Sequence, residues 1–311
     1  MRNSLLRAVE RSMDRLHLMT VFVAVAETES FAAASRRLGL SPAAVTRAVA
    51  ALEKRLGVKL FNRTTRLVRA TEAGQRYLED SRRIIAAADA ADEAVVGINA
   101  APRGQLAVTA PVLFGRMFVL PAIVEYLRRY PAMEVSALFV DRVVNLLEEG
   151  LDVGIRIGAL PDSTMKATRV GSVRQVLCAA PTYLKKHGVP EQPAALAQHT
   201  IIAASGVTPT NDWKFRQGTK SLTVRLTPRL TVNSNDAAIE AALQGFGIAR
   251  LLSYQIAPPV AAGRLKILLQ DFEPAPLPIH VIHREGRYGS VRIRAFVDLI
   301  AERLRKDRAL S

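Results

Sequence analysis

The sequence has very little cysteine and no long apolar segment. Cys178 is the one cysteine in 311 residues, so the chain cannot form a disulfide within itself, and this usage fits a reducing compartment. Cys178 lies in the apolar run 176–180, which favours a buried, inert thiol, with a redox sensor as the alternative. No apolar run approaches the roughly 20 residues that span a bilayer. These absences exclude a disulfide scaffold and an integral membrane protein.

The beginning of the chain lacks the features of an export signal. Leu5 and Leu6 are followed at once by Arg7, so there is no apolar stretch that ends in a small-residue cleavage site. We therefore expect a cytoplasmic protein without a membrane partner. Residues 1–12 are expected to form a disordered extension, and Met13 is an alternative start of translation.

The sequence also lacks the motifs of common enzyme sites. A nucleophile elbow, a Walker loop, a dinucleotide fingerprint and a Cys-His metal spacing are all missing. His280 and His283 are three apart in a strand-like run, so they face opposite sides and make a poor metal pair. Asp152 and Arg156 flank a buried strand, where a structural role is favoured over a catalytic one. We expect no catalytic residue, no metal and no cofactor; an enzyme is the alternative that a catalytic cluster in a cleft would reveal.

Positive charge is concentrated near the amino terminus. The chain has 43 Lys and Arg against 28 Asp and Glu, a formal net charge of +15. Residues 1–71 contain thirteen Lys and Arg against five Asp and Glu, an excess of eight. More than half of the excess therefore lies in less than a quarter of the chain. This distribution indicates a polyanionic partner, whereas a generally basic proteome would give a uniform excess.

The first quarter of the chain has the pattern of a helix-turn-helix. Residues 16–26 place apolar side chains on one helical face, a short helix follows at 31–38, and Gly39 permits a tight turn. Ser41 is a favoured N-cap and Pro42 a favoured first helical residue. The apolar positions of this third helix recur at helical spacing: they are Val45, Val49, Leu52 and Leu56.

The order of these helices indicates that the third one reads DNA. The amino-terminal half of the last helix of a helix-turn-helix enters the major groove, and Thr46 and Arg47 lie there, away from the apolar stripe. Residues 59–69 have two apolar stretches around a basic tip, which predicts a two-stranded wing. Each basic residue alone favours a solvated surface, but the capped helix, the wing and the clustered charge together favour DNA binding. The predicted DNA contacts are Ser41, Pro42, Ala43, Thr46, Arg47, Arg63, Thr64, Thr65 and Arg66.

Four stretches of this region resemble the winged helix-turn-helix of LysR-type transcriptional regulators. They are Phe31-Ala-Ala-Ala-Ser-Arg-Arg-Leu38, Ser41-Pro-Ala-Ala-Val-Thr-Arg47, Leu52-Glu-Lys-Arg-Leu-Gly-Val-Lys-Leu-Phe-Asn-Arg-Thr-Thr-Arg66 and Thr71-Glu-Ala-Gly74. In that family, Ser or Thr followed by Arg is often followed by Gln. Ala48 stands at that position here, which removes one base-reading amide. The resemblance implies that residues 13–71 form a winged helix-turn-helix domain that binds double-stranded promoter DNA.

A long helix is predicted at residues 72–101, because helix-forming residues continue without proline until Pro102. About 28 residues at roughly 1.5 Å each give a rod of about 40 Å. Its seam, spaced by three and four, consists of Tyr77, Ser81, Ile84, Ala88, Ala91, Val95 and Ile98. Packing against its own chain is one alternative. The resemblance implies the other, an antiparallel dimerisation helix with Tyr77, Ile84, Ala88, Ala91 and Val95 at the interface.

Beyond a break at Ala100-Ala101-Pro102, strand-like and helical segments alternate, which indicates an α/β fold. Strands are predicted at 106–109, 134–140, 153–157 and 278–284, and helices at 116–130, 142–149 and 290–306. Residues 172–270 repeat the alternation, and a late return to the first lobe predicts crossovers near Val173 and Asp271. The expected architecture is a two-lobed α/β effector domain of the type 2 periplasmic-binding-protein kind over 102–311, with lobe I at about 103–172 and 273–306 and lobe II at about 173–272.

The same region resembles LysR effector domains. The matching segments are Ala110-Pro111, Phe114-Gly115, Asp141-Arg142, 152–158, 232–236 and 245–249. The resemblance implies a small effector between the lobes, and a helix start, with free N–H donors and a favourable dipole, suits an organic anion such as a carboxylate. The predicted effector contacts are Ala110, Pro111, Val112, Val140, Asp141, Ser205, Gly206, Asn233 and Asn235. For Asn233 and Asn235, simple N-capping is an equal alternative. Pro111 stands where several family members have a hydroxyl residue, which weakens direct carboxylate recognition.

The expected function is an effector-responsive, sequence-specific DNA-binding regulator. The resemblance implies a homodimer or homotetramer that bends promoter DNA, contacts RNA polymerase and controls a neighbouring operon. The alternative from another class is a small-molecule-binding module whose basic head binds DNA without sequence preference. Competition with random duplex separates the two, because only a regulator keeps a large specificity ratio.

Overall fold

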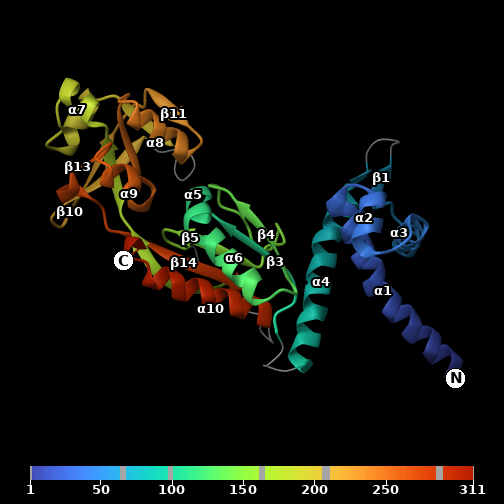
Figure 1. Cartoon of the computed structure of the whole chain (residues 1–311). Coiled ribbons are helices and arrows are strands. Elements are labelled where there is room, and N and C mark those ends of the chain that lie inside the picture. Colours follow the sequence, from blue (N-terminus) through green and yellow to red (C-terminus); the bar gives the residue numbers. More distant parts are fainter. Residues whose placement is uncertain are drawn as a thin grey trace. The chain divides into compact units, whose positions relative to one another are not determined.

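A computed structural model describes residues 2–63, 68–96, 101–160, 165–204, 211–284 and 290–310 (Figure 1). Its contacts divide the chain into two compact units. The first consists of Met1–Ala100 with the short segment Leu147–Gly150, and the second of Ala101–Leu146, Leu151–Glu285 and Val291–Ser311. The division falls beside the Pro102 break. In the part of the chain described here, no helix is both long and apolar enough to cross a membrane.

The first unit is a winged helix-turn-helix followed by a long helix, as predicted. Its elements are α1 (Arg2–Thr28), α2 (Phe31–Leu38), α3 (Pro42–Leu56), β1 (Phe61–Arg63), β2 (Val68–Ala70) and α4 (Glu72–Val96). Strands β1 and β2 pair antiparallel, with Phe61 opposite Ala70. Phe22 of α1 and Val49 of α3 are completely buried in the core between the helices. The apolar stripe of α3 therefore faces inward, as its spacing predicts.

Helix α1 begins earlier than the sequence pattern indicates. The prediction of a disordered extension at residues 1–12 is corrected, because the structure continues the helix back to Arg2. Residues 1–38 contain no glycine or proline, so no helix-breaking residue interrupts α1 between Arg2 and Thr28. In this helix side chains are described from Arg15 onward.

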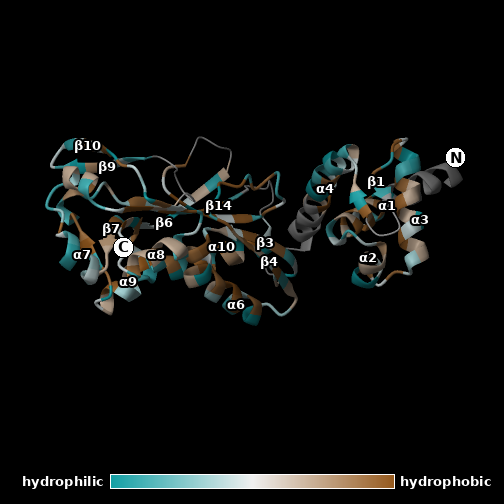
Figure 2. Ribbon diagram, turned by 90° about the horizontal axis from the view of Figure 1, so that it is seen from above, coloured by the Kyte–Doolittle hydropathy of each residue, from teal (hydrophilic) through white to brown (hydrophobic). Residues whose placement is uncertain are grey.

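Lobe I of the second unit is a five-stranded mixed sheet with helices packed on it. The sheet has the order β4 (Met133–Phe139), β3 (Gly104–Ala110), β5 (Val153–Ile157), β14 (Leu277–Arg284), β6 (Met165–Val173). Its helices are α5 (Val112–Phe114), the π-helical η1 (Gly115–Val119), α6 (Leu120–Arg129), α10 (Val291–Lys306) and the short 3-10 turn η4 (Arg308–Leu310). In Figure 2 the strands β3 and β14 are mainly hydrophobic, whereas α6 and α10 carry both kinds of residue. The rings of Tyr126 on α6 and Phe296 on α10 meet edge to face at 5.3 Å between centroids.

Two helices expected in lobe I differ from the prediction. The helix predicted at 116–130 starts earlier, at Val112, and passes through the π-helical segment. Residues 142–149 are not helical: they form a bend and a turn that ends at Gly150, whose φ is 64°. Val144 and Leu146 are buried under this turn. Adjacent β-branched residues disfavour a helix here, and burial of two apolar side chains stabilises the irregular backbone instead.

Lobe II has its own five-stranded sheet. Its order is β11 (Leu230–Val232), β8 (Ile201–Ala204), β12 (Ile248–Leu252), β7 (Gln175–Ala179), β13 (Lys266–Leu268). The helical elements of the lobe are α7 (Pro181–His187), η2 (Pro193–Gln198), α8 (Asn235–Leu243), α9 (Ser253–Ala261) and η3 (Gln270–Phe272), and β9 (Asp212–Gln217) and β10 (Lys220–Arg225) form a hairpin. Cys178 of β7 is buried beside α8 and α9, and burial raises the pKa of its thiol to about 12. The thiol is therefore protonated and inert, as its apolar neighbours indicate.

The chain crosses between the two sheets twice. Arg174 connects β6 of lobe I to β7 of lobe II, and residues 273–276 connect η3 of lobe II to β14 of lobe I. Both crossings lie next to the positions expected near Val173 and Asp271. The second unit is therefore the two-lobed α/β fold that the alternation predicts.

Candidate functional site

Local capping positions the third helix. The Oγ of Ser41 accepts a hydrogen bond from the backbone N–H of Ala44 at 3.2 Å, and Pro42 is the first helical residue. At the other end Gly57 adopts a left-handed conformation with φ of 71°, and its N–H donates to the carbonyl of Glu53. These caps satisfy backbone groups that a bare helix end would leave unpaired. The boundaries of α3 are thus fixed by its own sequence.

The exposed face of α3 carries the residues predicted to read DNA. Ala43, Thr46 and Arg47 are exposed, whereas Val45 is completely buried. The Thr46 hydroxyl donates to the carbonyl of Pro42 at 2.9 Å, so only the lone pairs of its oxygen are available to accept. Within the part of the chain that is described, Arg47 has no hydrogen-bond or ion-pair partner. An exposed guanidinium without a neighbouring carboxylate is suited to a polyanion.

Position 48, where the family often has a glutamine, is half-buried. Ala48 packs against the core of the first unit, on the side of α3 next to Val45 and Val49. A longer side chain at this position would begin at the edge of the core. Ala48 has no polar side-chain group, so the candidate base-reading groups of α3 are those of exposed residues such as Thr46 and Arg47.

A buried carboxylate joins α3 to the wing. Glu53 accepts hydrogen bonds from the backbone N–H groups of Leu60 at 2.9 Å and Phe61 at 3.3 Å, and from Lys59 Nζ at 2.9 Å. Burial raises the pKa of this carboxyl, but the three hydrogen bonds and the Lys59 charge outweigh it and hold the pKa below its usual value. Glu53 is therefore ionised at neutral pH and fixes the start of the wing.

The Thr71-Glu-Ala-Gly74 motif joins the wing to α4. Thr71 caps the helix by accepting from the N–H of Gly74 at 3.0 Å, and its own hydroxyl donates to the carbonyl of Lys59 at 2.8 Å. A Cβ added to Gly74 would lie 2.1 Å from the carbonyl oxygen of Leu60. Only glycine permits this close approach between helix and wing.

Some of the predicted wing residues cannot be placed. Arg63 is the last residue of β1, and its side chain is outside the description; Thr64, Thr65 and Arg66 lie outside the described residues altogether. Arg69 on β2 is exposed and pairs in register with Asn62. The wing therefore presents at least one exposed cation from a paired strand.

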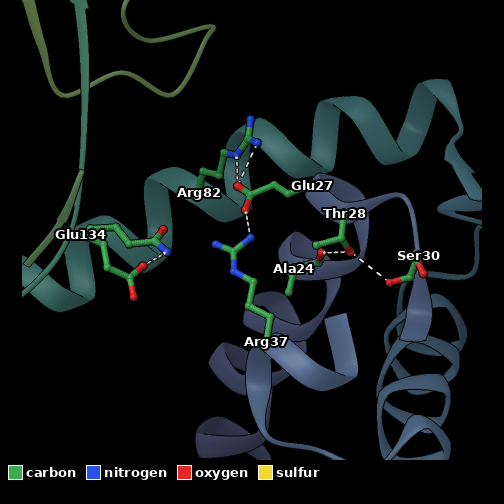
Figure 3. Close-up of polar contacts among 8 residues, drawn as sticks. Ala24, Glu27, Thr28, Ser30, Arg37, Arg82 and Glu134 are labelled. Atoms are coloured by element: carbon green, nitrogen blue, oxygen red, sulfur yellow. Dashed lines mark hydrogen bonds and ion pairs between the residues drawn. The ribbon is translucent and has the colours of Figure 1, made fainter. Parts of the chain in front are cut away.

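The helix-turn-helix is held to α4 by one carboxylate (Figure 3). Glu27 at the end of α1 accepts from Arg37 of α2 at 2.8 Å and from Arg82 of α4 at 3.0 Å. Thr28 donates to the carbonyl of Ala24 at 2.8 Å and lies 3.0 Å from the carbonyl of Ser30. Glu27 thus connects three helices at the turn between α1 and α2.

The predicted dimer seam on α4 divides into two parts. Tyr77 packs in its own chain, with its ring 5.5 Å from that of Phe22, and Ser81 is completely buried. This corrects the assignment of Tyr77 to the interface, because helical spacing alone does not identify which partner a seam meets. Ile84 is 43% exposed and Ala88 is half-buried. Ala91 and Val95 belong to α4, but their side chains lie outside the description.

A cavity of about 220 Å³ lies between the two lobes of the second unit. Both lobes contribute to its wall. The lining includes the predicted residues Pro111, Val140, Asp141 and Asn235, and in addition Arg142, Val143, Arg156, Ile157, Gln175, Ile202, Asn211, Trp213, Thr231, Arg250, Leu251, Tyr254 and Leu277. Three guanidinium groups and one carboxylate therefore line the same space.

Asp141 already occupies the helix start at which an anion is expected. Its Oδ1 accepts from the N–H of Val112 at 3.0 Å, and its Oδ2 accepts from Nδ2 of Asn235 on lobe II at 3.3 Å. Asn235 is buried, while Ser234 caps α8 by accepting from the N–H of Ala237. Ser234 is thus the N-cap of α8, and Asn235 connects the lobes.

The other predicted effector residues do not line the cavity or cannot be placed. Ala110 is completely buried in the core of lobe I, which corrects its assignment as an effector contact. Val112 donates its backbone N–H to Asp141 but does not line the cavity. Asn233 is exposed and does not line the cavity either. Ser205 and Gly206 lie outside the described residues.

Arg250 and Trp213 are two cavity residues that sequence reasoning missed. The Arg250 guanidinium lies over the Trp213 ring, with Cζ 4.7 Å from the centroid. Burial lowers the pKa of Arg250 to about 10, so the group is still a cation at neutral pH. The available signal was a lone charged residue in the apolar strand segment 248–252. Among the described residues, no group of three or more His, Cys, Asp or Glu side chains could hold a metal ion.

Two family models match the chain. Residues 16–75 match the model of the bacterial regulatory helix-turn-helix protein, lysR family, and residues 99–305 match the model of the LysR substrate binding domain. The first match contains the helix-turn-helix and wing, and the second contains both lobes and the cavity between them.

Characterised proteins resemble the chain over almost its full length. The HTH-type transcriptional repressor PA14_22550 of Pseudomonas aeruginosa (strain UCBPP-PA14) is 34% identical over 292 residues, which are 93% of this chain and 92% of that protein. The HTH-type transcriptional activator AaeR of Escherichia coli (strain K12) is 31% identical and covers 93% of this chain and 94% of its own length. The solved structure of CrgA, a LysR-type transcriptional regulator from Neisseria meningitidis, matches with a TM-score of 0.59 at 31% identity, over 93% of this chain and 98% of that one.

Proposed function

Because the chain belongs to the LysR family of DNA-binding transcriptional regulators, we propose that its binding to promoter DNA is controlled by a small organic anion held between its two lobes. The observation that carries this proposal is the cavity of about 220 Å³ with Arg142, Arg156 and Arg250 in its wall. Asp141 is the one carboxylate of the lining, so the described wall has an excess of positive charge. Apolar side chains separate these groups, which strengthens electrostatic interactions in the cavity.

The contact between Asp141 and Asn235 supports a control mechanism based on movement of the lobes. It joins lobe I to lobe II through a hydrogen bond of 3.3 Å at the cavity wall. An anion that binds more tightly to one arrangement of the lobes shifts the population toward it. In our proposal this shift changes the spacing of the DNA-binding units within the oligomer.

On DNA, we assign base reading to Thr46 and Arg47 and backbone contact to the wing. Both α3 residues are exposed on the same face, and Arg47 has no intramolecular partner in the described structure. The wing assignment includes Arg63, Thr64, Thr65 and Arg66 and rests on the basic sequence of its tip.

The proposed assembly is a homodimer through α4, or a homotetramer, that acts in the cytoplasm where promoter DNA and RNA polymerase are found. Exposed Ile84 and half-buried Ala88 on one side of α4 support a helix-to-helix contact. Two DNA-binding units related by symmetry suit a near-palindromic site.

The test is a DNA-binding assay of the full-length protein on the intergenic region upstream of its own gene. Binding is measured at fixed salt against excess random duplex, with and without a set of organic anions that includes monocarboxylates and dicarboxylates. We expect a specificity ratio of at least about 10³ and a change in affinity or footprint with at least one anion. Equal affinity for random duplex would instead favour a non-specific architectural protein, and an unchanged footprint with every anion would contradict effector control.

A further inference from the structure

Arg250 lines the cavity between the lobes, with its guanidinium over the ring of Trp213. We infer that its guanidinium binds the carboxylate of a compact monocarboxylate whose apolar part fills the rest of the cavity. This inference rests on the proposed function above, because it names the class of effector and the group that recognises it. Neither the family pattern in the sequence nor the helix-start argument points to this residue.

The position of Arg250 in the sheet makes it an unusual place for a charge. It lies on β12, where Ala249 and Leu251 point into the core beneath α8 and α9. Side chains alternate along a strand, so Arg250 shares the opposite face with Ile248, which packs in the second core of lobe II. The guanidinium is therefore taken largely out of bulk water.

Among the described residues, Arg250 has no carboxylate as a counter-ion. In the described structure no carboxylate and no hydrogen-bond acceptor lies within bonding distance of the Arg250 side chain. Its partner is the face of Trp213, which is 3% exposed. A desolvated arginine in a protein is normally paired with an acid, because a buried unpaired charge is costly. The cavity that Arg250 lines gives an anionic ligand access to this charge.

The stack on Trp213 prepares the guanidinium for a planar acceptor. A guanidinium stacked on an aromatic ring contacts the ring through its planar face. The N–H donors at the edge of the guanidinium are then left for hydrogen bonds. Those donors form a fork that matches the two oxygens of a carboxylate. The indole also holds the guanidinium plane in place, so less side-chain entropy is lost when a ligand binds.

The other charged groups of the wall, Arg142, Arg156 and Asp141, already have partners within the protein. Arg156 donates to the carbonyls of Ile155 at 3.2 Å and Val144 at 3.0 Å, so this guanidinium is used inside lobe I. Asp141 holds the N–H of Val112 and the amide of Asn235. Its negative charge lies in the same cavity and would repel a second anionic group. The lining therefore favours a single negative charge over a dianion.

The remaining wall limits the size and polarity of the ligand. About 220 Å³ corresponds to the share of roughly seven water molecules in the liquid, which is enough space for a compact acid. The apolar part of the wall includes Val140, Ile157, Ile202, Leu251 and Leu277. Gln175 and Thr231 also line the cavity, and their side chains can donate or accept a hydrogen bond with a polar substituent of such an acid.

The experiment measures ligand binding to the full-length protein by calorimetry. The probes are benzoate and cyclohexanecarboxylate, each compared with its neutral amide, benzamide or cyclohexanecarboxamide. We expect the acids to bind and the amides to bind at least about tenfold more weakly, because only the acid forms a charge-assisted pair. R250M is expected to lower affinity for the acids about 10- to 100-fold, and R250K to give an intermediate loss because lysine lacks the fork.

The control variant is R229M. Arg229 also lies over an aromatic ring, that of Phe246 at 5.8 Å, but it is exposed and does not line the cavity. Its replacement should leave acid affinity unchanged. Circular dichroism and urea unfolding of each variant check that the fold is retained, and R250K keeps the test informative should R250M not fold.

Each result decides between the two proposals. If the acids bind R250M as tightly as the unmodified protein, or the amides bind as well as the acids, the role of Arg250 is overturned while effector control stands. If neither acid binds the unmodified protein at up to about 10 mM, where even millimolar affinity is detected, the monocarboxylate class is overturned. A change of the DNA footprint with succinate or phosphate in that case would keep the proposed function, and no change with any anion would overturn both.

Discussion

Arg174 and Glu273 form an ion pair that joins the two segments through which the chain crosses between its lobes. Nη1 of Arg174 lies 3.0 Å from both oxygens of the Glu273 carboxylate. The Glu273 side chain is 12% exposed, whereas that of Arg174 is 48% exposed. Burial raises the pKa of Glu273 more than Arg174 lowers it, so the net pKa lies above its usual value. The arginine therefore compensates the desolvation of this carboxylate only in part.

Removal of either partner should have unequal effects. Arg174→Met leaves a buried carboxylate without a cation and should lower the free energy of unfolding by about 1–3 kcal/mol, whereas Glu273→Gln should cost less than about 1 kcal/mol. Urea unfolding of the full chain at pH 7 measures both. Because the folded-state pKa of Glu273 is raised, its protonation should reduce the Arg174→Met penalty as the pH falls through that pKa. Equal losses in the two variants would show that the pair itself, not the buried charge, decides stability.

Glu53 should make the DNA-binding unit sensitive to acid. Its pKa is lowered in the folded state, so its stabilising contribution is complete above the unfolded value of about 4.3 and is lost as the pH falls through the folded pKa. Glu53→Gln keeps one acceptor but loses the charge, and it should lower the free energy of unfolding by about 1–3 kcal/mol at pH 7. The difference from the unmodified protein should shrink below about pH 4.

Glu72→Gln is the matched control for Glu53→Gln. Glu72 forms an ion pair with Arg76 on the surface of α4, and both side chains are about 80% exposed. A surface pair contributes little, so this variant should unfold within about 0.5 kcal/mol of the unmodified protein. A loss for Glu53→Gln that persists unchanged at low pH would contradict the role of its charge.

Arg47→Ala should weaken specific DNA binding by about 1–3 kcal/mol and relax the preference for one base of the site. The reason is that an unpaired guanidinium on the exposed face of α3 is available for bidentate contact with a base. The measurement is a competition between the promoter and random duplex at one salt concentration. Arg128→Ala, at an exposed arginine of α6 in the other unit, should leave the specificity ratio unchanged. An unchanged ratio for Arg47→Ala would remove this helix position from base reading.

Ala88→Glu should weaken self-association of the protein. A carboxylate at a half-buried position of the α4 seam would be desolvated against the same residue type of a second copy. Sedimentation at several concentrations would show a shift to lower mass. Ala87→Glu is the control, because Ala87 is exposed on the neighbouring face of the same helix. Identical masses for the two variants would show that the seam does not carry the interface.

The features that were predictable from the sequence are those with local causes. Ser41, Pro42 and Gly57 determine the ends of α3 through contacts within a few residues, and the alternation of apolar residues determines the strands of both lobes. The turn at 142–149 was missed because it depends on burial of Val144 and Leu146 against other elements of the fold. Tyr77 has the spacing of the seam but packs on Phe22 of its own chain. Periodicity identifies the apolar face of a helix, but it does not identify whether the same chain or a second copy packs on that face.

The candidate effector cavity could be predicted from the sequence only in part. Pro111, Val140, Asp141 and Asn235 do line the cavity, because helix starts and strand ends follow from the order of elements. Asp141 was expected to meet a ligand, but it fills the helix start itself. Arg250 depends on the register of β12 between two other strands and on Trp213 from a hairpin elsewhere in the chain. Such a convergence of distant segments cannot be derived from spacing along one strand.

Replacement of Arg250 is expected to change the charge of the cavity wall without a large change in the stability of the fold. Its half-buried side chain lines the cavity and has no ion pair among the described residues, so an apolar residue of similar volume would occupy the same space at little cost to folding. In evolutionary terms, a single codon change at this position would alter the charge of the cavity wall. The DNA-reading helix, the long helix and both sheets would be inherited unchanged.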